Sequence, residues 1–275
     1  MKADLHCHSY YSDGTLSPLA VVEMAAHNQV EMLALTDHDS TTGLLEASQA
    51  AEQHDVRLID GVEISVTWRD YVVHIVGLNI DPNNAVLQAG LLSNTTARAS
   101  RSADIIQALL TQDIDIRQAV AEQIPEQGLI TRTHIARALI SGGYVKNMDK
   151  AFKRYLAKGK AAYVGGEWAG LAEAVSWIRQ AGGLAVIAHP MRYRLGATRL
   201  DALVNDFVDA GGRGLEVITA TQDVNQTARC VQLVKQYDLF ASTGSDFHSP
   251  DQPWARLGCC PPLPTTVTPV WEAFC

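Results

Sequence analysis

The segment ADLHCH, residues 3–8, joins a short apolar run to two histidines, and the rest of the chain is best interpreted from it. The same design returns in MLALTDHD at 32–39, LAVIAHP at 184–190 and LFASTGSDFH at 239–248. Further apolar runs lie at 57–66, 72–80 and 214–219. Because these seven runs are short and rich in Val, Ile and Leu, they are typical of buried strands.

Helical patterns separate most of these runs, at 19–28, 41–54, 171–180, 200–210 and 224–237. Strands that alternate with helices indicate βαβ units, so we expect an α/β fold built on a parallel sheet. Only the runs 57–66 and 72–80 lack a helix between them. Residues 68–70 form a turn of hairpin length there, so these two strands are expected to pair directly.

The segment 85–160 breaks this rhythm, because it is helical in pattern and shows no convincing strand. Gly142 and Gly143 mark an internal stop within it. We therefore expect a metal-binding body formed by 1–84 and 161–275, with 85–160 as an inserted helical subdomain that binds substrate. The proline-rich stretch 261–269 is expected to wrap around the end of the body.

Composition excludes several classes of protein. No stretch approaches the roughly 18 apolar residues of a membrane span, and the first motif begins at Asp4, so we expect a cytoplasmic chain without a membrane contact. The net charge of −8 argues against binding to duplex DNA. The cysteines are odd in number and lack a C-x-x-C spacing, which fits a reducing compartment and no thiolate zinc site. They are Cys7, Cys230, Cys259, Cys260 and Cys275.

Positive charge is concentrated between residues 131 and 160, where eight basic residues stand against one acid. The segment therefore carries +7, and the remainder must carry −15 to reach the net charge of −8. A solvated face of surface helices is the ordinary explanation for such a run. The motif TRTHIARAL at 131–139, with Arg132 and His134, favours a phosphate-binding surface instead, and we expect this positive segment to face the metal centre.

Histidines and carboxylates at the strand ends form the candidate metal centre. His6 and His8 are two residues apart, which on a strand points both imidazoles to one face, while Cys7 faces the other way into the core. A lone histidine beside an apolar run is more often a core residue than a ligand, but catalytic groups of a β/α barrel gather at the C-terminal ends of its strands. The candidates are His6, His8, Asp13, His38, Glu63, His74, His189, Asp246 and His248.

This donor set of imidazoles and carboxylates without thiolate suits manganese, zinc or iron. We expect two or three divalent ions per chain, with manganese first and zinc or iron as alternatives. Asp37 and Asp39 are expected to act outside the ligand set, by orienting histidines such as His38.

The motifs H-x-H, S-D-G, T-D-H, G-x-E, A-H-P and S-D-x-H, in this order, resemble the polymerase and histidinol phosphatase (PHP) superfamily across nearly the whole chain. The segment TRTHIARAL resembles the subgroup of 3′,5′-nucleoside bisphosphate phosphatases and 5′-to-3′ exoribonucleases. That subgroup usually has proline where this chain has Thr133, a departure that leaves Arg132 and His134 in place.

The resemblance implies a distorted seven-stranded, TIM-like β/α barrel with three metal sites. His6, His8, Glu63 and Asp246 would hold the first ion. Asp13, His38 and His248 would hold the second. Glu63 would bridge to a third ion held by His74 and His189.

A phosphomonoesterase is the expected activity, removing the 3′-phosphate of 3′,5′-nucleoside bisphosphates to give 5′-mononucleotides by attack of a metal-bridging hydroxide. Arg132 would clamp a phosphate, with Arg192 and Arg194 as further candidates at the mouth. His134 would bind phosphate or protonate the leaving oxygen, or would simply pack the insertion.

Three alternatives stay open: a 5′-to-3′ exonuclease on short RNA, a noncatalytic PHP module that assists a polymerase, and a histidinol phosphate phosphatase. The second is disfavoured by the complete ligand set.

Overall fold

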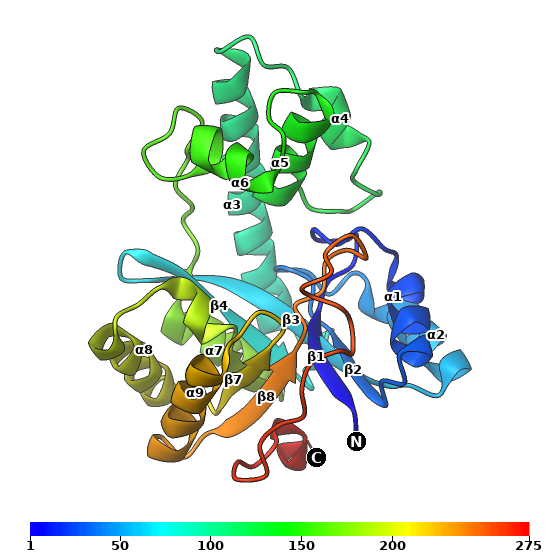
Figure 1. Cartoon of the computed structure of the whole chain (residues 1–275), viewed down its shortest axis with the longest axis vertical. Helices are drawn as coiled ribbons and strands as arrows, with labels where there is room; N and C mark the ends of the chain where they lie inside the picture. The colour runs from blue at the N-terminus through cyan, green and yellow to red at the C-terminus, as the bar shows by residue number, and fades with distance from the viewer. Residues whose placement is uncertain (275) are drawn as a thin grey trace.

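Seven strands follow one another around a barrel-like sheet in the computed structural model, which describes residues 1–274 (Figure 1). Cys275 lies outside the described residues. The strands are β1 (Ala3–Cys7), β2 (Met32–Leu35), β3 (Arg57–Trp68), β4 (Tyr71–Leu78), β6 (Leu184–Ile187), β7 (Gly214–Thr219) and β8 (Phe240–Gly244). All lie where the apolar runs predicted them, and the α/β barrel class is confirmed. A two-residue strand, β5 (Ala169–Gly170), pairs with β3 and was not predicted.

The sheet closes between its first and last strands. The backbone N–H of Asp246 donates to the carbonyl of His6 at 2.8 Å, and the N–H of His8 donates to Phe247 at 2.9 Å. Gly244 is required at this seam, because a Cβ there would lie 2.3 Å from the Cβ of His6. Closure therefore brings the ends of β1 and β8 together at the mouth of the barrel.

One hairpin distorts the parallel order, as expected for strands without a crossover helix. β3 and β4 pair antiparallel from Gly61–Leu78 to Trp68–Tyr71, and β4 also pairs antiparallel with β6. Because β4 runs against its neighbours, its first half lies at the end of the barrel where the parallel strands finish. His74 in β4 is thus opposite Ser65 in β3, two residues from Glu63.

Helices cover the outside of the sheet in two groups. α1 (Pro18–His27) and α2 (Leu44–His54) pack on β1 and β2, and Cys7 is buried in that layer as predicted. α7 (Leu171–Gln180), α8 (Ala197–Asp209) and α9 (Val224–Gln236) cover the strands from β3 to β8. A separate apolar cluster fills the barrel between Leu5, Ile59, Val76 and Val186.

The segment between β4 and β5 is helical, as the sequence predicted, and rises above the barrel (Figure 1). It contains α3 (Ala85–Leu110), α4 (Arg117–Ala121), α5 (Arg132–Ser141), α6 (Met148–Ala151) and a π-helix (Phe152–Leu156). The first half of α3 packs on the barrel through Leu87 and Leu91, and its second half enters a separate cluster through Ile105 and Leu109. We propose that the barrel and the inserted helices are separate subdomains.

The end of the chain returns along the barrel. The N–H of Ala241 in β8 donates to the carbonyl of Thr268 at 2.8 Å, and a short 3-10 helix (Val270–Ala273) buries Val270 against the barrel interior. No helix in residues 1–274 combines the length and the apolar character needed to cross a bilayer.

Candidate metal centre

All nine predicted ligands converge at the mouth of the barrel, linked by contacts between imidazole nitrogens and carboxylate oxygens. Their donor atoms form three groups that could each hold an ion: His6, His8, Glu63 and Asp246; His8, Asp13, His38 and His248; and His38, Glu63 and His74. The grouping resembles the expected ligand sets, with His8, His38 and Glu63 each shared between two groups. His189, expected to bind the third ion, belongs to none of the three groups and contacts Glu63 at 3.0 Å.

The first group combines two strand ends with the middle of β3. The Nε2 atom of His6 lies 3.3 Å from both Glu63 Oε1 and Asp246 Oδ1. The Nε2 atom of His8 lies 3.4 Å from Glu63 Oε2 and 3.2 Å from Asp246 Oδ1. Both imidazoles therefore present the same nitrogen to the same two carboxylates, which is a compact setting for one cation.

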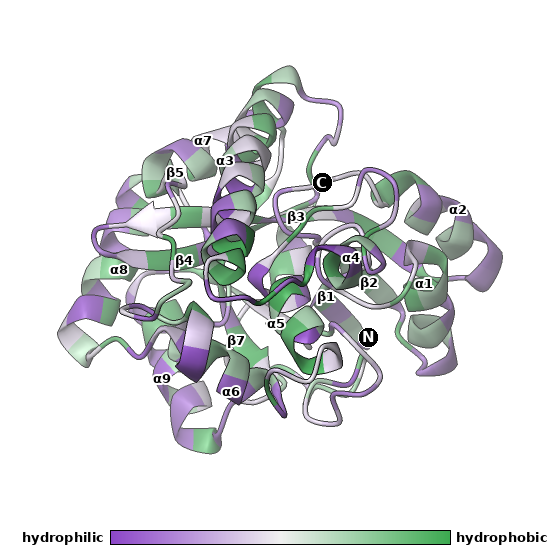
Figure 2. Ribbon diagram, turned by 90° about the horizontal axis from the view of Figure 1, so that it is seen from above, coloured by the Kyte–Doolittle hydropathy of each residue, from purple (hydrophilic) through white to green (hydrophobic). Residues whose placement is uncertain are grey.

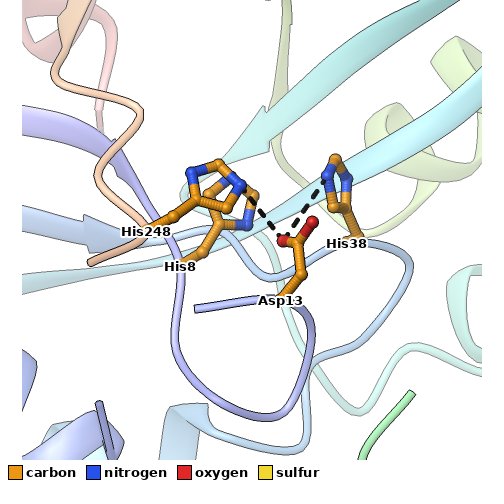
Figure 3. A group of neighbouring side chains, drawn as sticks. All are labelled: His8, Asp13, His38 and His248. Carbon is orange, nitrogen blue, oxygen red and sulfur yellow. Dashed lines mark ion pairs between the residues drawn. The ribbon is translucent and has the colours of Figure 1, made fainter. Parts of the chain in front are cut away.

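The second group forms around Asp13, which the loop after β1 carries toward three histidines (Figure 3). Its Oδ1 atom lies 3.1 Å from His248 Nε2 and 3.8 Å from His38 Nε2. The imidazoles of His8 and His248 stack at 4.2 Å between ring centroids. The rings are inclined at 27°, and their nitrogens belong to the same ligand group.

Glu63 lies at the centre of the arrangement. Its two oxygens are within 3.4 Å of five histidines, with the shortest contacts to His38 (2.8 Å), His74 (2.9 Å) and His189 (3.0 Å). Burial alone would raise the pKa of this carboxyl, but charge interactions with His74, His38 and His6 hold it well below its usual range. Glu63 is therefore an ionised carboxylate at the position expected of a bridging ligand.

Several buried ligand atoms have no hydrogen-bond partner in the described part of the protein and are available to coordinate a metal. Among residues 1–274, His6 Nε2, Asp13 Oδ1, His38 Nδ1, Glu63 Oε2 and His189 Nδ1 are buried and make no hydrogen bond. Leaving such atoms unsatisfied costs about 1–3 kcal/mol each. Divalent cations would satisfy four of them, all but His189 Nδ1, because these four belong to the three donor groups.

Glu216 in β7 orients two of the ligands, and sequence analysis missed it. Its Oε1 atom lies 2.6 Å from His6 Nδ1, which leaves Nε2 of that ring for the centre. Its Oε2 atom accepts the backbone N–H of His189. An acid in the middle of an apolar strand was the signal, because an ionised group is costly there without such partners.

Asp37 and Asp39 lie outside the three ligand groups, as expected, but no hydrogen bond joins either carboxylate to His38 among residues 1–274, so the orientation of that ring was wrongly expected. Asp37 reaches a histidine through Ser12, whose hydroxyl lies 3.3 Å from His8 Nδ1. Asp37 accepts hydrogen bonds from the hydroxyls of Ser9 and Ser12, each at 2.6 Å, and so braces the loop that carries Asp13. Asp39 instead faces α3, where it forms an ion pair with Arg98 and accepts from Asn94 at 2.8 Å.

A pocket of about 260 Å³ is lined by metal ligands and by four arginines. Arg132 and Arg192 line it, as predicted, and Arg192 pairs with Asp246. Arg98 and Arg101 of α3 also line it, with their guanidinium carbons 4.7 and 5.6 Å from the Trp168 ring. Sequence analysis missed Arg98, which lies four residues after Asn94 and four before Ser102, and all three are buried on one side of α3.

Two predicted substrate residues lie outside this lining. His134 is buried beneath it, where its Nδ1 accepts the Thr131 N–H at 3.1 Å as part of the capping box of α5. Arg194 is exposed and adopts a left-handed φ of 52° where the 3-10 helix Pro190–Tyr193 ends. Because the chain leaves the mouth at that point, the structure gives Arg194 no place in the pocket.

Comparisons with known proteins agree with this geometry. The sequence model of the PHP domain family matches residues 4–165. A 3′,5′-nucleoside bisphosphate phosphatase from Chromobacterium violaceum is 42% identical over 98% of this chain and 95% of its own length. A 5′-3′ exoribonuclease from Haemophilus influenzae is 42% identical over 99% of both chains.

Solved structures show the same fold. An amidohydrolase from Chromobacterium violaceum, solved with sulfate and no metal, superimposes with a TM-score of 0.95 at 41% identity, covering all of this chain and 96% of its own. A protein of Bifidobacterium adolescentis, provisionally named a metal-dependent phosphoesterase, gives a TM-score of 0.84 at 30% identity over 98% of this chain and 93% of its own. On its sequence, its fold and its buried donor groups, the chain belongs to the PHP domain family and is a phosphoester hydrolase.

Proposed function

We propose that the chain removes the 3′-phosphate from 3′,5′-nucleoside bisphosphates and releases 5′-mononucleotides. One observation carries the proposal: the same pocket is lined by metal-type ligands and by the guanidinium groups of Arg98, Arg101 and Arg132. Metal ligands and cations within one small pocket fit a substrate with two phosphates. The relative from Chromobacterium violaceum is named a 3′,5′-nucleoside bisphosphate phosphatase, which supports the same substrate class.

Arg101 and Arg132 are free to receive the second phosphate. Arg98 is already neutralised by Asp39, but within the described chain neither Arg101 nor Arg132 forms an ion pair. Burial, together with the charges of Arg132 and Arg98, lowers the pKa of Arg101 to about 10. A bound phosphate would relieve this repulsion, and a guanidinium offers it two parallel hydrogen bonds.

The nine ligands would hold two or three divalent ions, with manganese our first expectation and zinc or iron the alternatives. Such ions activate water near neutral pH and neutralise charge on the leaving oxygen. Arg192, paired with Asp246 at the edge of the ligand groups, is placed to orient the scissile phosphate. The cytoplasmic location and the absence of duplex DNA as a partner stay predictions.

His134 is better placed to position Arg132 than to donate a proton. Burial lowers the pKa of its imidazole to about 4, so the ring is neutral near pH 7. Its Nδ1 accepts from the backbone of Thr131, which fixes the first turn of α5 and with it Arg132. We therefore propose His134 as a positioning residue. Because its Nδ1 accepts a hydrogen bond, the proton of the neutral ring lies on Nε2, which can act as a hydrogen-bond donor.

Substrate pairs that differ by one phosphate test the proposal. For Arg132→Ala and Arg101→Ala we expect kcat/KM on adenosine 3′,5′-bisphosphate to fall about 10- to 160-fold, equivalent to the roughly 1.5–3 kcal/mol of a hydrogen bond to a charged group. Hydrolysis of adenosine 3′-monophosphate should change little. Arg213→Ala is the control, because Arg213 is exposed before β7 at the opposite end of the barrel. Equal losses on both substrates would refute a site for the second phosphate.

A second activity, 5′-to-3′ degradation of short RNA, is favoured by the relative from Haemophilus influenzae that carries that name. It would use the same metal ligands, and a terminal nucleotide of RNA also carries phosphate on both sides of its ribose. Release of the 5′-terminal nucleotide before any other, from an oligomer labelled at its 5′-phosphate, would establish this activity and its direction.

A further inference from the structure

A basic groove of about 600 Å³ lies on the insertion, separate from the metal pocket. Its cations are Lys146, Lys150, Lys153 and Arg154, and Tyr144 and Val145 line it as well. Its size falls within the range of about 300–1,000 Å³ that is common for ligand sites. We call these six residues the basic groove.

The groove accounts for the positive run that the metal pocket leaves unexplained. We expected the segment 131–160 to face the metal centre as a whole, but Arg132 is its one basic residue among those lining the metal pocket. Arg137 donates to the backbone carbonyl of Asp13 at 2.9 Å. Four of the eight basic residues line the groove instead, so the expectation was wrong for most of the run.

These four charges are largely uncompensated. Within residues 1–274 the groove has a single ion pair, between Lys153 and Asp149 at 3.0 Å, and both partners are exposed. Exposed pairs of this kind contribute little, so the pair does not explain why the cations are gathered. The rest of the chain is strongly acidic, which makes the groove a local attractor for a polyanion.

The groove adjoins the metal pocket through one short element. Phe152, at the start of the π-helix, lines the metal pocket, where the Arg132 guanidinium carbon lies 5.6 Å from its ring. The next two residues, Lys153 and Arg154, line the groove. Seen from above in Figure 2, α6 lies beside α5 over the body of the protein. The metal pocket and the groove are therefore bordered by the same short element, the π-helix Phe152–Leu156.

We infer that the basic groove binds the phosphodiester backbone of a short single-stranded RNA whose 5′ end lies in the metal pocket. Sites for single strands combine cations along the backbone with aromatic rings for the bases, and Tyr144 supplies such a ring here. The placement of the 5′ end rests on the proposed function, whereas the backbone contact rests on the groove alone.

Binding of 3′-fluorescein-labelled RNA with phosphorothioate linkages that resist cleavage, measured by anisotropy on the full chain in manganese, tests the inference. Lys146→Ala with Lys150→Ala should weaken a 5′-phosphorylated decamer about tenfold. The slope of log K against log salt should fall by about 1.4, or about 0.7 for each lost phosphate contact. A dinucleotide, too short to reach the groove, should bind both proteins alike. Lys235→Ala, on α9 of the barrel, is the control for loss of an exposed lysine.

The outcomes separate the two proposals. Wild-type affinity of the double variant for the decamer would overturn the groove as an RNA site, and so would equal losses on decamer and dinucleotide. A decamer of DNA that binds as tightly as RNA and loses as much would overturn the restriction to RNA. Hydrolysis of the bisphosphate in manganese should stay within about twofold of wild type in the double variant. If wild type fails to hydrolyse the bisphosphate while the variant loses RNA affinity, the proposed phosphatase function fails and the groove stands.

Discussion

Glu63 shows how one side chain determines the chemistry of this barrel. It is fully buried in β3, and its oxygens contact histidines from β1, β4 and the loops after β2 and β6. A lone ionised carboxylate would be very costly in that position. The five imidazoles offset part of the cost, and cations would offset more. Function and local stability therefore depend on the same residue.

Replacing Glu63 by Gln should remove metal from two of the three donor groups, because Glu63 belongs to both. We expect metal content by mass spectrometry to fall and turnover to drop by more than the roughly 10- to 100-fold that loss of an outer partner costs. Asp246→Ala removes a ligand from one group only and should retain more metal. Full metal content in Glu63→Gln would contradict the bridging assignment.

Glu216 offers the matching test for an outer partner. Glu216→Gln keeps the shape of the side chain but removes the charge that holds His6 Nδ1 at 2.6 Å. We expect a loss of about 10- to 100-fold in metal affinity with the fold intact, measured by competition with a fluorescent chelator. An unchanged affinity would mean that the strand alone orients His6.

At the scale of elements, the strands position the site and α3 connects it to the insertion. Sequence periodicity located every barrel strand and each covering helix within a few residues, because alternation between apolar runs and helical patterns is a local property. It could not show that Arg98, in a helix of the insertion, would cross to Asp39 after β2. Such a contact depends on how the insertion folds back, and nothing local to either residue reports it.

The Arg98–Asp39 pair should connect α3 to the barrel. Arg98→Ala would leave Asp39 charged and buried without its partner, a change that typically costs about 3–5 kcal/mol. We expect the free energy of unfolding in urea to fall by that order. The double variant Arg98→Met with Asp39→Asn should recover much of the loss, because no unpaired charge remains. Additive losses in the double variant would show that the two residues act independently.

At the scale of the whole molecule, charge is divided between regions. The barrel mouth collects carboxylates and histidines, and the insertion carries the cations that face it or line the basic groove. The sequence predicted the ligand candidates well because each motif ends a strand of a barrel whose parallel strands finish at one mouth. It predicted the substrate residues less well, since Arg101 and Trp168 reach the pocket from segments with no motif of their own.

Metal should therefore hold the whole molecule together as well as support its chemistry. Without cations the mouth buries ionised Glu63, Asp13 and Asp246 among imidazole nitrogens that lack hydrogen-bonding partners. A ligand that binds only the folded state stabilises it by about 2.7 kcal/mol when its concentration is 100 times Kd. We expect exhaustive chelation to abolish hydrolysis and to lower the free energy of unfolding in urea by at least that order, and added manganese to restore both. Glu63→Gln, which loses a shared ligand, should gain much less stability from manganese than wild type. Equal unfolding free energies and equal turnover with and without metal, in protein verified as metal-free, would contradict a metal centre at the barrel mouth.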